Sequence, residues 1–216
     1  MQDRIAIRRF TLIEMLAVVT IASIMIAVFV PSFNRMMFGS KVDQAASNFK
    51  LGLEVAQSHA VSSRKYVAMV IPVKYGDVTA TALKPYCDGG YRLAFVKKSG
   101  SNWHFSDWLP ESSWRNPRDG AALTALGTLK QLTLASGASV ASGDDWESLG
   151  SADNRKAVVF SPYGGTADQN DVSFTFTEAR FTGNTDSGDK AVYDIPNGDN
   201  RLTLQVKGIT GRVSYQ

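Results

Sequence analysis

Phe10-Thr11-Leu12-Ile13-Glu14-Met15 begins the stretch that decides the fold of this chain, because the sequence continues from it to Val30 without another charge. The 21 residues from Phe10 to Val30 contain one charged side chain, that of Glu14. At ~1.5 Å per helical residue the stretch reaches about 32 Å, close to the ~30 Å apolar thickness of a bilayer. It therefore predicts a helix that can span a membrane.

The carboxylate of Glu14 is the unusual feature of this stretch. A secretory signal has a shorter apolar core followed by a cleavage site of small residues, whereas here the apolar run continues to Pro31 and leads into a helical pattern. A carboxylate at the centre of a membrane helix costs roughly 2.5–3.5 kcal/mol on insertion scales. Glu14 therefore needs a partner within the membrane. Alternatively, the stretch is a simple signal anchor, and the Glu14 side chain extends to the cytoplasmic interface.

These residues together resemble the N-terminus of type IV pilins and type II secretion pseudopilins. The resemblance rests on a short basic leader, Phe-Thr-Leu-Ile-Glu at 10–14, the uncharged run and a proline 21 residues after the phenylalanine. In that family a membrane peptidase cuts before the phenylalanine and methylates the new amine, which the glutamate of a neighbouring subunit then neutralises. The resemblance implies prepilin peptidase as a partner, cleavage between Arg9 and Phe10, and assembly roles for Glu14 and Pro31.

Position 9 departs from the family pattern, which usually has glycine immediately before the cut. Arg9 is bulky and charged, so an uncut chain, permanently anchored and carrying a β domain, is an alternative to a processed subunit.

The rest of the chain is long enough for one globular domain of about 150 residues. We expect a leader at 1–9, a membrane and assembly helix at 10–30, an amphipathic stalk helix at 31–65 and a β-rich domain at 66–216. The net charge of +3 falls to +1 without the leader, so global charge favours no particular partner. The leader arginines favour the cytoplasmic side, which directs the C-terminal domain outward from the inner membrane. The lone Cys87 is predicted to be a buried structural thiol, with an intermolecular bridge as the alternative.

The stalk shows an apolar stripe at helical spacing. Pro31 is expected to kink the helix, Gly39 and Gly52 to weaken it, and Ser63 to lie near its end. The stripe predicted to face a sheet consists of Val42, Ala45, Ala46, Phe49, Leu53, Ala56 and Ala60.

Short strand-like runs follow the stalk, separated by turn residues. They are 66–73, 91–97, 131–134, 157–160, 172–177, 201–206 and 212–215. Because no long helical run separates most of them, we expect an antiparallel sheet or two packed sheets. Three segments are predicted to be loops: 99–120, packed by its own tryptophans or presenting them to a carbohydrate or partner, then 136–153 and 183–200.

A finer resemblance follows from the C-terminal part. The segments 158–165 (Val-Val-Phe-Ser-Pro-Tyr-Gly-Gly), 202–204 and 209–213 (Ile-Thr-Gly-Arg-Val) look like the GspH/FimT group of minor pseudopilins and minor pilins. That resemblance implies an α+β, pilin-like fold with a long N-terminal helix on antiparallel strands. It also implies assembly with other pilin or pseudopilin subunits in a pilus or secretion pseudopilus.

Catalysis is not expected. The two histidines, His59 and His104, are 45 positions apart, and no hydrolase, zinc-protease or phosphate-binding motif occurs. We therefore expect no enzyme activity, cofactor or metal. The acidic residues at 183–200 do not have the spacing of a calcium hand, so a solvated loop is favoured over a calcium site; they are Asp186, Asp189, Asp194 and Asp199.

DNA capture is the main functional alternative, because some FimT-like minor pilins bind DNA through a basic C-terminal strand. The corresponding tail here offers three cations, Arg201, Lys207 and Arg212. Each phosphate contact adds affinity through counterion release, so three cations on a nearly neutral domain predict weak binding.

Overall fold

A computed structural model describes residues 11–87, 89–116, 120–141, 143–184, 191–195 and 198–216, without the side chains of 31–39, 153, 180–184 and 191–194. The chain divides into two compact units, Met1–Phe38 and Gly39–Gln216. Helix α1, Leu12–Ser63, contributes residues to both.

The described part of the first unit is the apolar half of α1. Every residue from Leu12 to Val30 is exposed, and this stretch of 19 residues is long and apolar enough to cross a membrane. Helical backbone continues through Pro31, and the kink expected there stays a prediction.

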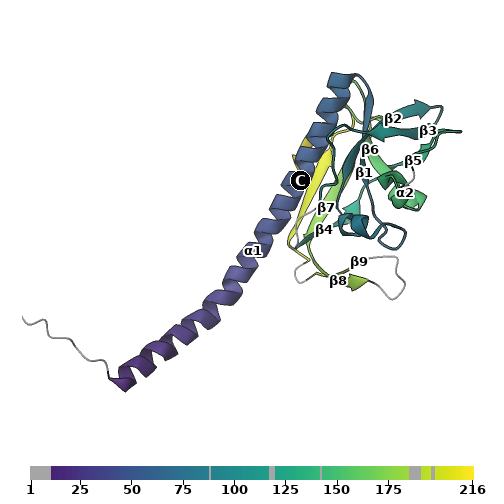
Figure 1. The fold of residues 1–216 in the computed structure, drawn as a ribbon. Helices are drawn as coiled ribbons and strands as arrows, with labels where there is room; N and C mark the ends of the chain where they lie inside the picture. Colours follow the sequence, from purple (N-terminus) through teal and green to yellow (C-terminus); the bar gives the residue numbers. More distant parts are fainter. Residues whose placement is uncertain (1–10, 88, 117–119, 142, 185–190, 196–197) are drawn as a thin grey trace, which may run out of the picture. The chain divides into compact units, whose positions relative to one another are not determined.

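The second unit begins with the amphipathic half of α1, which lies along the β strands (Figure 1). All seven residues of the predicted stripe are buried, with exposed fractions of 0–1%. The helix ends at Ser63, as expected, and Arg64 follows in a left-handed conformation with φ 54°. The stripe was therefore predicted correctly from spacing alone.

Five strands form a closed barrel in the order β1, β2, β3, β5, β6. Their bounds are Tyr66–Ile71 (β1), Arg92–Ser99 (β2), Asn102–Trp108 (β3), Lys130–Leu134 (β5) and Lys156–Phe160 (β6). Pairing is antiparallel except between β3 and β5, which are parallel. Inside, Trp146 from the short helix α2, Asp145–Ser148, stacks on Phe105 with ring centroids 4.3 Å apart. Two 3-10 helices, η1 at Thr81–Tyr86 and η2 at Ala152–Asn154, lie in the connections.

A four-stranded antiparallel sheet, in the order β11, β10, β7, β4, packs against the buried stripe of α1. Its strands are Ala121–Leu126 (β4), Val172–Glu178 (β7), Arg201–Val206 (β10) and Val213–Tyr215 (β11). Phe174 and Phe176 of β7 pack on Phe49 of α1, with ring centroids 4.9 and 5.1 Å away. A separate hairpin joins β8, Arg180–Asn184, to β9, Ala191–Asp194. The predicted α+β class, with a long helix on antiparallel strands, is confirmed.

The predicted loops need correction. The segment 99–120 contains β3, and Trp103 and Trp108 are buried in the barrel core rather than presented to a ligand. The strand was missed because β3 carries an extra residue, Ser106, opposite the junction of Phe95 and Val96, which breaks the alternation of apolar side chains. The segment 183–200 contains β9 and the end of β8, and 136–153 contains α2. One pairing, that between β3 and β5, is parallel.

Cys87 is buried, 3% exposed, in a small cluster with Val78 and Leu83. The prediction of a buried thiol is confirmed.

Candidate functional site

The first turn of α1 holds the carboxylate of Glu14 against Thr11. The backbone N–H and the hydroxyl of Thr11 both donate to Oε2 of Glu14, at 2.8 Å each. In return, the N–H of Glu14 donates to the hydroxyl of Thr11 at 3.3 Å. This reciprocal pattern is a capping box, which satisfies donors that a helix N-terminus leaves unpaired. Glu14 therefore has a partner within its own chain.

Sequence reasoning missed Thr11, although the spacing Thr-x-x-Glu is the known signature of a capping box. The two bonds to Glu14 end on one oxygen, Oε2. A carboxylate offers about four acceptor positions on two oxygens, so the cap leaves capacity for a further donor. A cation next to Glu14 can therefore bind without displacing Thr11.

The other residues of the expected assembly site are less fully described. Arg9 and Phe10, the expected processing residues, lie outside the described residues. Pro31 lies within α1, and its side chain is not described. Cleavage, methylation and the role of Pro31 remain predictions.

The three cations proposed for DNA are only partly brought together. Lys207 and Arg212 lie in one turn, where the N–H of Lys207 donates to the carbonyl of Arg212 at 2.9 Å. Arg201 starts β10, six residues before Lys207 and thus about 20 Å away along an extended strand. The ammonium group of Lys207 already pairs with Asp171, at 2.8 Å. All three side chains are exposed.

The turn at 207–212 is fixed by hydrogen bonds. The carboxylate of Asp171 accepts from the Lys207 ammonium and from the N–H of Gly208, and these bonds lower the pKa of Asp171. On α1, the side-chain amide of Gln57 donates to the carbonyls of Gly164 and Thr210, at 2.7 and 2.8 Å. Gln57 therefore ties together 158–165 and 209–213, two of the segments that carry the finer resemblance.

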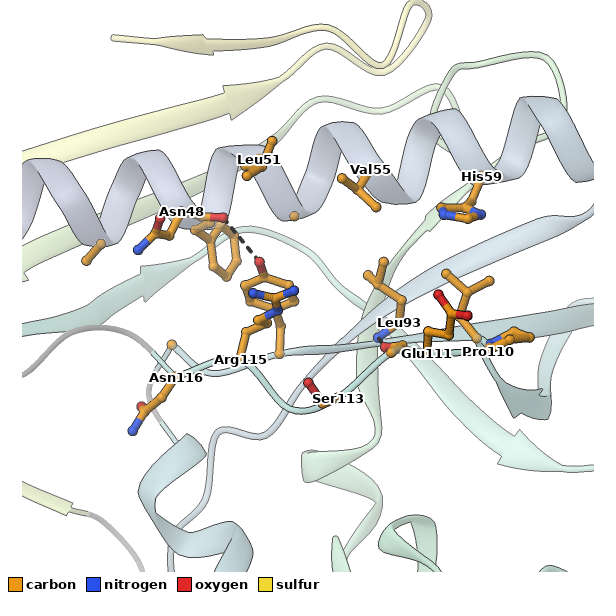
Figure 2. Close-up of a pocket in the computed structure, with 17 residues that line it drawn as sticks. Asn48, Leu51, Val55, His59, Leu93, Pro110, Glu111, Ser113, Arg115 and Asn116 are labelled. Atoms are coloured by element: carbon orange, nitrogen blue, oxygen red, sulfur yellow. Dashed lines mark hydrogen bonds between the residues drawn. The ribbon is translucent and has the colours of Figure 1, made fainter.

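A groove of about 500 Å³ lies between α1 and the segment 109–116 (Figure 2). At its centre, the hydroxyl of Tyr91 donates to the backbone carbonyl of Asn48 at 3.1 Å. Burial raises the pKa of the Tyr91 phenol, although nearby Arg115 opposes the shift, so the phenol stays a donor. The helix side of the groove is formed by Asn48, Leu51, Val55 and His59, and the opposite side includes Pro110, Glu111, Ser113 and Arg115.

Gly52 has a structural role that sequence reasoning did not identify. A Cβ atom at Gly52 would lie 2.4 Å from the ring of Tyr91, so the close approach of that ring requires glycine. Gly52 was expected only to weaken the helix, but its lack of a side chain leaves the space that the Tyr91 ring occupies.

The histidines do not form a catalytic group. His59 is exposed at the groove, whereas Nδ1 of His104 lies 3.1 Å from the hydroxyl of Thr133 on the barrel. Among the described residues, no three His, Cys, Asp or Glu side chains are placed to hold a metal ion. Asp186 and Asp189 and the side chain of Asp194 lie outside what is described, so the calcium question stays a prediction.

Comparison with known proteins gives structural matches of low sequence identity. No family model matches the chain, and no curated protein matches it by sequence. The type IV minor pilin FimU of Pseudomonas aeruginosa strain PAO1 matches with a TM-score of 0.41 and 13% identity, covering 82% of this chain and 89% of that chain. A second crystal form of FimU gives 0.37 and 15%, covering 81% and 91%. The minor pseudopilin EpsH from the type 2 secretion system of Vibrio cholerae gives 0.41 and 10%, covering 82% and 96%. At 10–15% identity, residue roles do not transfer from these proteins.

Proposed function

We propose that this chain is a structural subunit of a type IV pilus or type II secretion pseudopilus, anchored in the inner membrane and assembled through the apolar half of α1. The observation that carries the proposal is the exposed apolar surface of Leu12–Val30, with Glu14 in its first turn. Within its unit, no described residue covers this surface. Lipid before assembly and neighbouring helices after it would cover it.

The role of Glu14 in assembly follows from its position. Removal of the leader would leave a free amine at Phe10, and in a stack of parallel helices that amine would lie against the Glu14 carboxylate of a neighbour. A charge pair in apolar surroundings is strong only when both partners are present. The pair would thus fix the register between adjacent helices.

Two substitutions separate this role from helix capping. Glutamine also completes a capping box, so Glu14→Gln keeps the bonds to Thr11 and removes the charge. Thr11→Val removes the hydroxyl and keeps the charge. We expect Glu14→Gln and Glu14→Ala to stay in the membrane but to be lost from purified filaments, and Thr11→Val to be incorporated at a reduced level. Normal recovery of Glu14→Gln in filaments would show that the charge does not direct assembly.

Processing is tested directly by the intact mass and N-terminal residue of the chain recovered from its native membrane. A chain starting at methylated Phe10 supports assembly. A chain still starting at Met1 has no Phe10 amine, and the protein is then a membrane anchor carrying a β domain.

A further inference from the structure

Two pairs of successive cations come together where α1 ends and β2 approaches its hairpin turn. Arg64 and Lys65 connect α1 to β1, and Lys97 and Lys98 lie near the end of β2. The first residue of β1 is paired with Val96 of β2, so Lys65 before it and Lys97 after it lie side by side. All four cationic side chains are exposed. We call these four residues the basic cluster.

The basic cluster is not neutralised by the fold. Elsewhere in the domain cations pair with carboxylates, as Lys130 does with Asp168. Among the residues that the structure describes, no carboxylate forms an ion pair with any of the four cations of the cluster. The residue opposite Lys97 on β3 is His104, not an acid. Because like charges side by side on neighbouring strands lower stability, the fold itself does not account for this arrangement.

Two of the cations are held in place by aromatic rings. The ammonium group of Lys65 lies 5.2 Å from the ring centroid of Phe95, and that of Lys98 lies 5.3 Å from the ring centroid of Trp103. Both distances are within the ~6 Å range of a cation–π contact. These contacts restrict two long, flexible side chains before any partner arrives, so less conformational freedom is lost when an anion binds.

The position of the cluster argues against the lipids of the anchoring membrane. Within 39–216, the cluster lies at the end of α1 that is far from the residues where the helix joins the domain (Figure 1). From Gly39 to Ser63 the helix rises about 36 Å, several times the ~8 Å over which physiological salt screens a charge. In the proposed subunit, lipid headgroups are therefore out of reach of the cluster, and this step rests on the proposed function.

Asp107 argues against a nucleic acid. It lies on β3 opposite Phe95, whose ring Lys65 contacts, and its carboxylate accepts the N–H of Trp108 at 2.8 Å. A fixed negative charge among the cations repels a continuous phosphate backbone, whereas a protein segment can present carboxylates to the cations and another group to Asp107. We propose that the basic cluster binds an acidic segment of a partner protein, whose Asp and Glu side chains pair with its ammonium and guanidinium groups.

The test measures binding of a labelled peptide of about ten glutamates to the full-length chain in uncharged detergent at low salt, by fluorescence anisotropy. An oligothymidylate of the same length is the nucleic-acid arm. Lys65→Gln combined with Lys97→Gln should weaken peptide binding roughly five- to tenfold, since each exposed charge pair contributes modestly. The matched control, Arg201→Gln combined with Arg212→Gln, removes the same charge from exposed positions near β10 and β11 and should change binding less than about twofold.

A further variant separates loss of charge from loss of fold. Asp107→Asn removes the negative charge and keeps an oxygen that can accept the Trp108 N–H, so it should tighten peptide binding about two- to threefold. A gain in affinity does not arise from misfolding.

Three outcomes overturn the proposal: no binding of the peptide at low salt, equal losses in the lysine variant and the arginine control, or tighter binding of the oligothymidylate, which would assign the cluster to nucleic acid. The assay requires neither processing nor filaments. A chain that binds the peptide but is absent from filaments contradicts only the proposed function, whereas a chain that enters filaments but does not bind the peptide contradicts only the role of the basic cluster.

Discussion

The two halves of α1 are both rich in apolar residues, and they differ in what covers those residues. From Leu12 to Val30 every side chain is exposed. From Val42 to Ala60 the seven apolar residues of the stripe are 0–1% exposed. An apolar stretch all around a helix requires a partner outside the chain, while a stripe finds its partner within the fold. The comparison separates the half of the helix whose apolar stripe is buried within the fold from the half whose apolar residues are all exposed.

The largest expected effect on stability comes from removing the side chain of Phe49 from the buried stripe of α1. Phe49 contacts Tyr91, Phe174 and Phe176, so Phe49→Ala should lower the free energy of unfolding by about 3–5 kcal/mol. All four tryptophans lie beyond residue 100, so denaturation of the full-length chain in detergent, followed by tryptophan fluorescence, reports on this unit. Leu51→Ala, on the exposed face of the same helix, should change the value by less than about 0.5 kcal/mol. Equal effects of the two substitutions would remove the distinction between the faces.

In the exposed half of α1, Leu12–Val30, membrane insertion should be sensitive to an added charge. Ile21→Arg places a cation in the middle of the apolar stretch, which should oppose membrane insertion by about 2.5–3.5 kcal/mol. The fraction of chain resistant to alkaline extraction of membranes measures this, with Ile21→Leu as the control. Tryptophan fluorescence of the folded β unit should be unchanged. Unaltered insertion of Ile21→Arg would mean that the exposed surface does not contact lipid.

A smaller effect on stability is expected at Gly52, where α1 contacts the Tyr91 ring. Alanine favours a helix over glycine by about 1 kcal/mol, yet Gly52→Ala should destabilise the chain by about 1–3 kcal/mol because the new Cβ meets the Tyr91 ring. Combining it with Tyr91→Leu should give a smaller loss than the sum of the two single substitutions. Additive losses in denaturant unfolding would show that the ring and the new Cβ do not collide.

The smallest effect concerns the turn at 207–212, whose Thr210 carbonyl accepts a hydrogen bond from Gln57. The Lys207 ammonium and the Gly208 N–H hold the pKa of Asp171 below its ordinary value of 3.8. Because the folded pKa is below the unfolded one, this carboxylate stabilises the fold above about pH 4, and its contribution is lost as the pH falls through the folded pKa. Asp171→Asn should therefore reduce the difference in thermal midpoint between pH 5 and pH 3. An unchanged difference would show that this pair does not contribute to acid sensitivity.

The sequence predicted most of the fold because spacing carries information about burial. The stripe on α1 and the strands at 172–177 and 201–206 follow helical or alternating patterns, and the structure has them at nearly the same residues. The misses have local causes. The extra residue in β3 disrupts its alternation, and β4, Ala-Ala-Leu-Thr-Ala-Leu, consists mostly of residues that do not favour strands.

The candidate site was only half visible in the sequence. Glu14 was evident because a charge stands out in an apolar run, and its bond to Thr11 was available from the capping pattern. The groove could not be predicted, because it depends on the pairing of Tyr91 with Arg115, which lie 24 positions apart. The same holds for the contact between 161–166 and 207–212, which is made by the N–H of Thr166, donating to the carbonyl of Gly208 at 2.8 Å, and by Gln57.

The position of β1 has a mechanical consequence. The strand follows α1 after only Arg64 and Lys65, and it pairs through five residues with β2 on one side and five residues with β6 on the other. A force applied along α1 would therefore act first on β1, which is hydrogen-bonded to a neighbouring strand at each edge. The ladder bonds would have to yield together rather than one after another, and the resistance of the domain to force would be set by its unfolding rate. In the proposed subunit, tension on the membrane anchor would reach the β domain through β1.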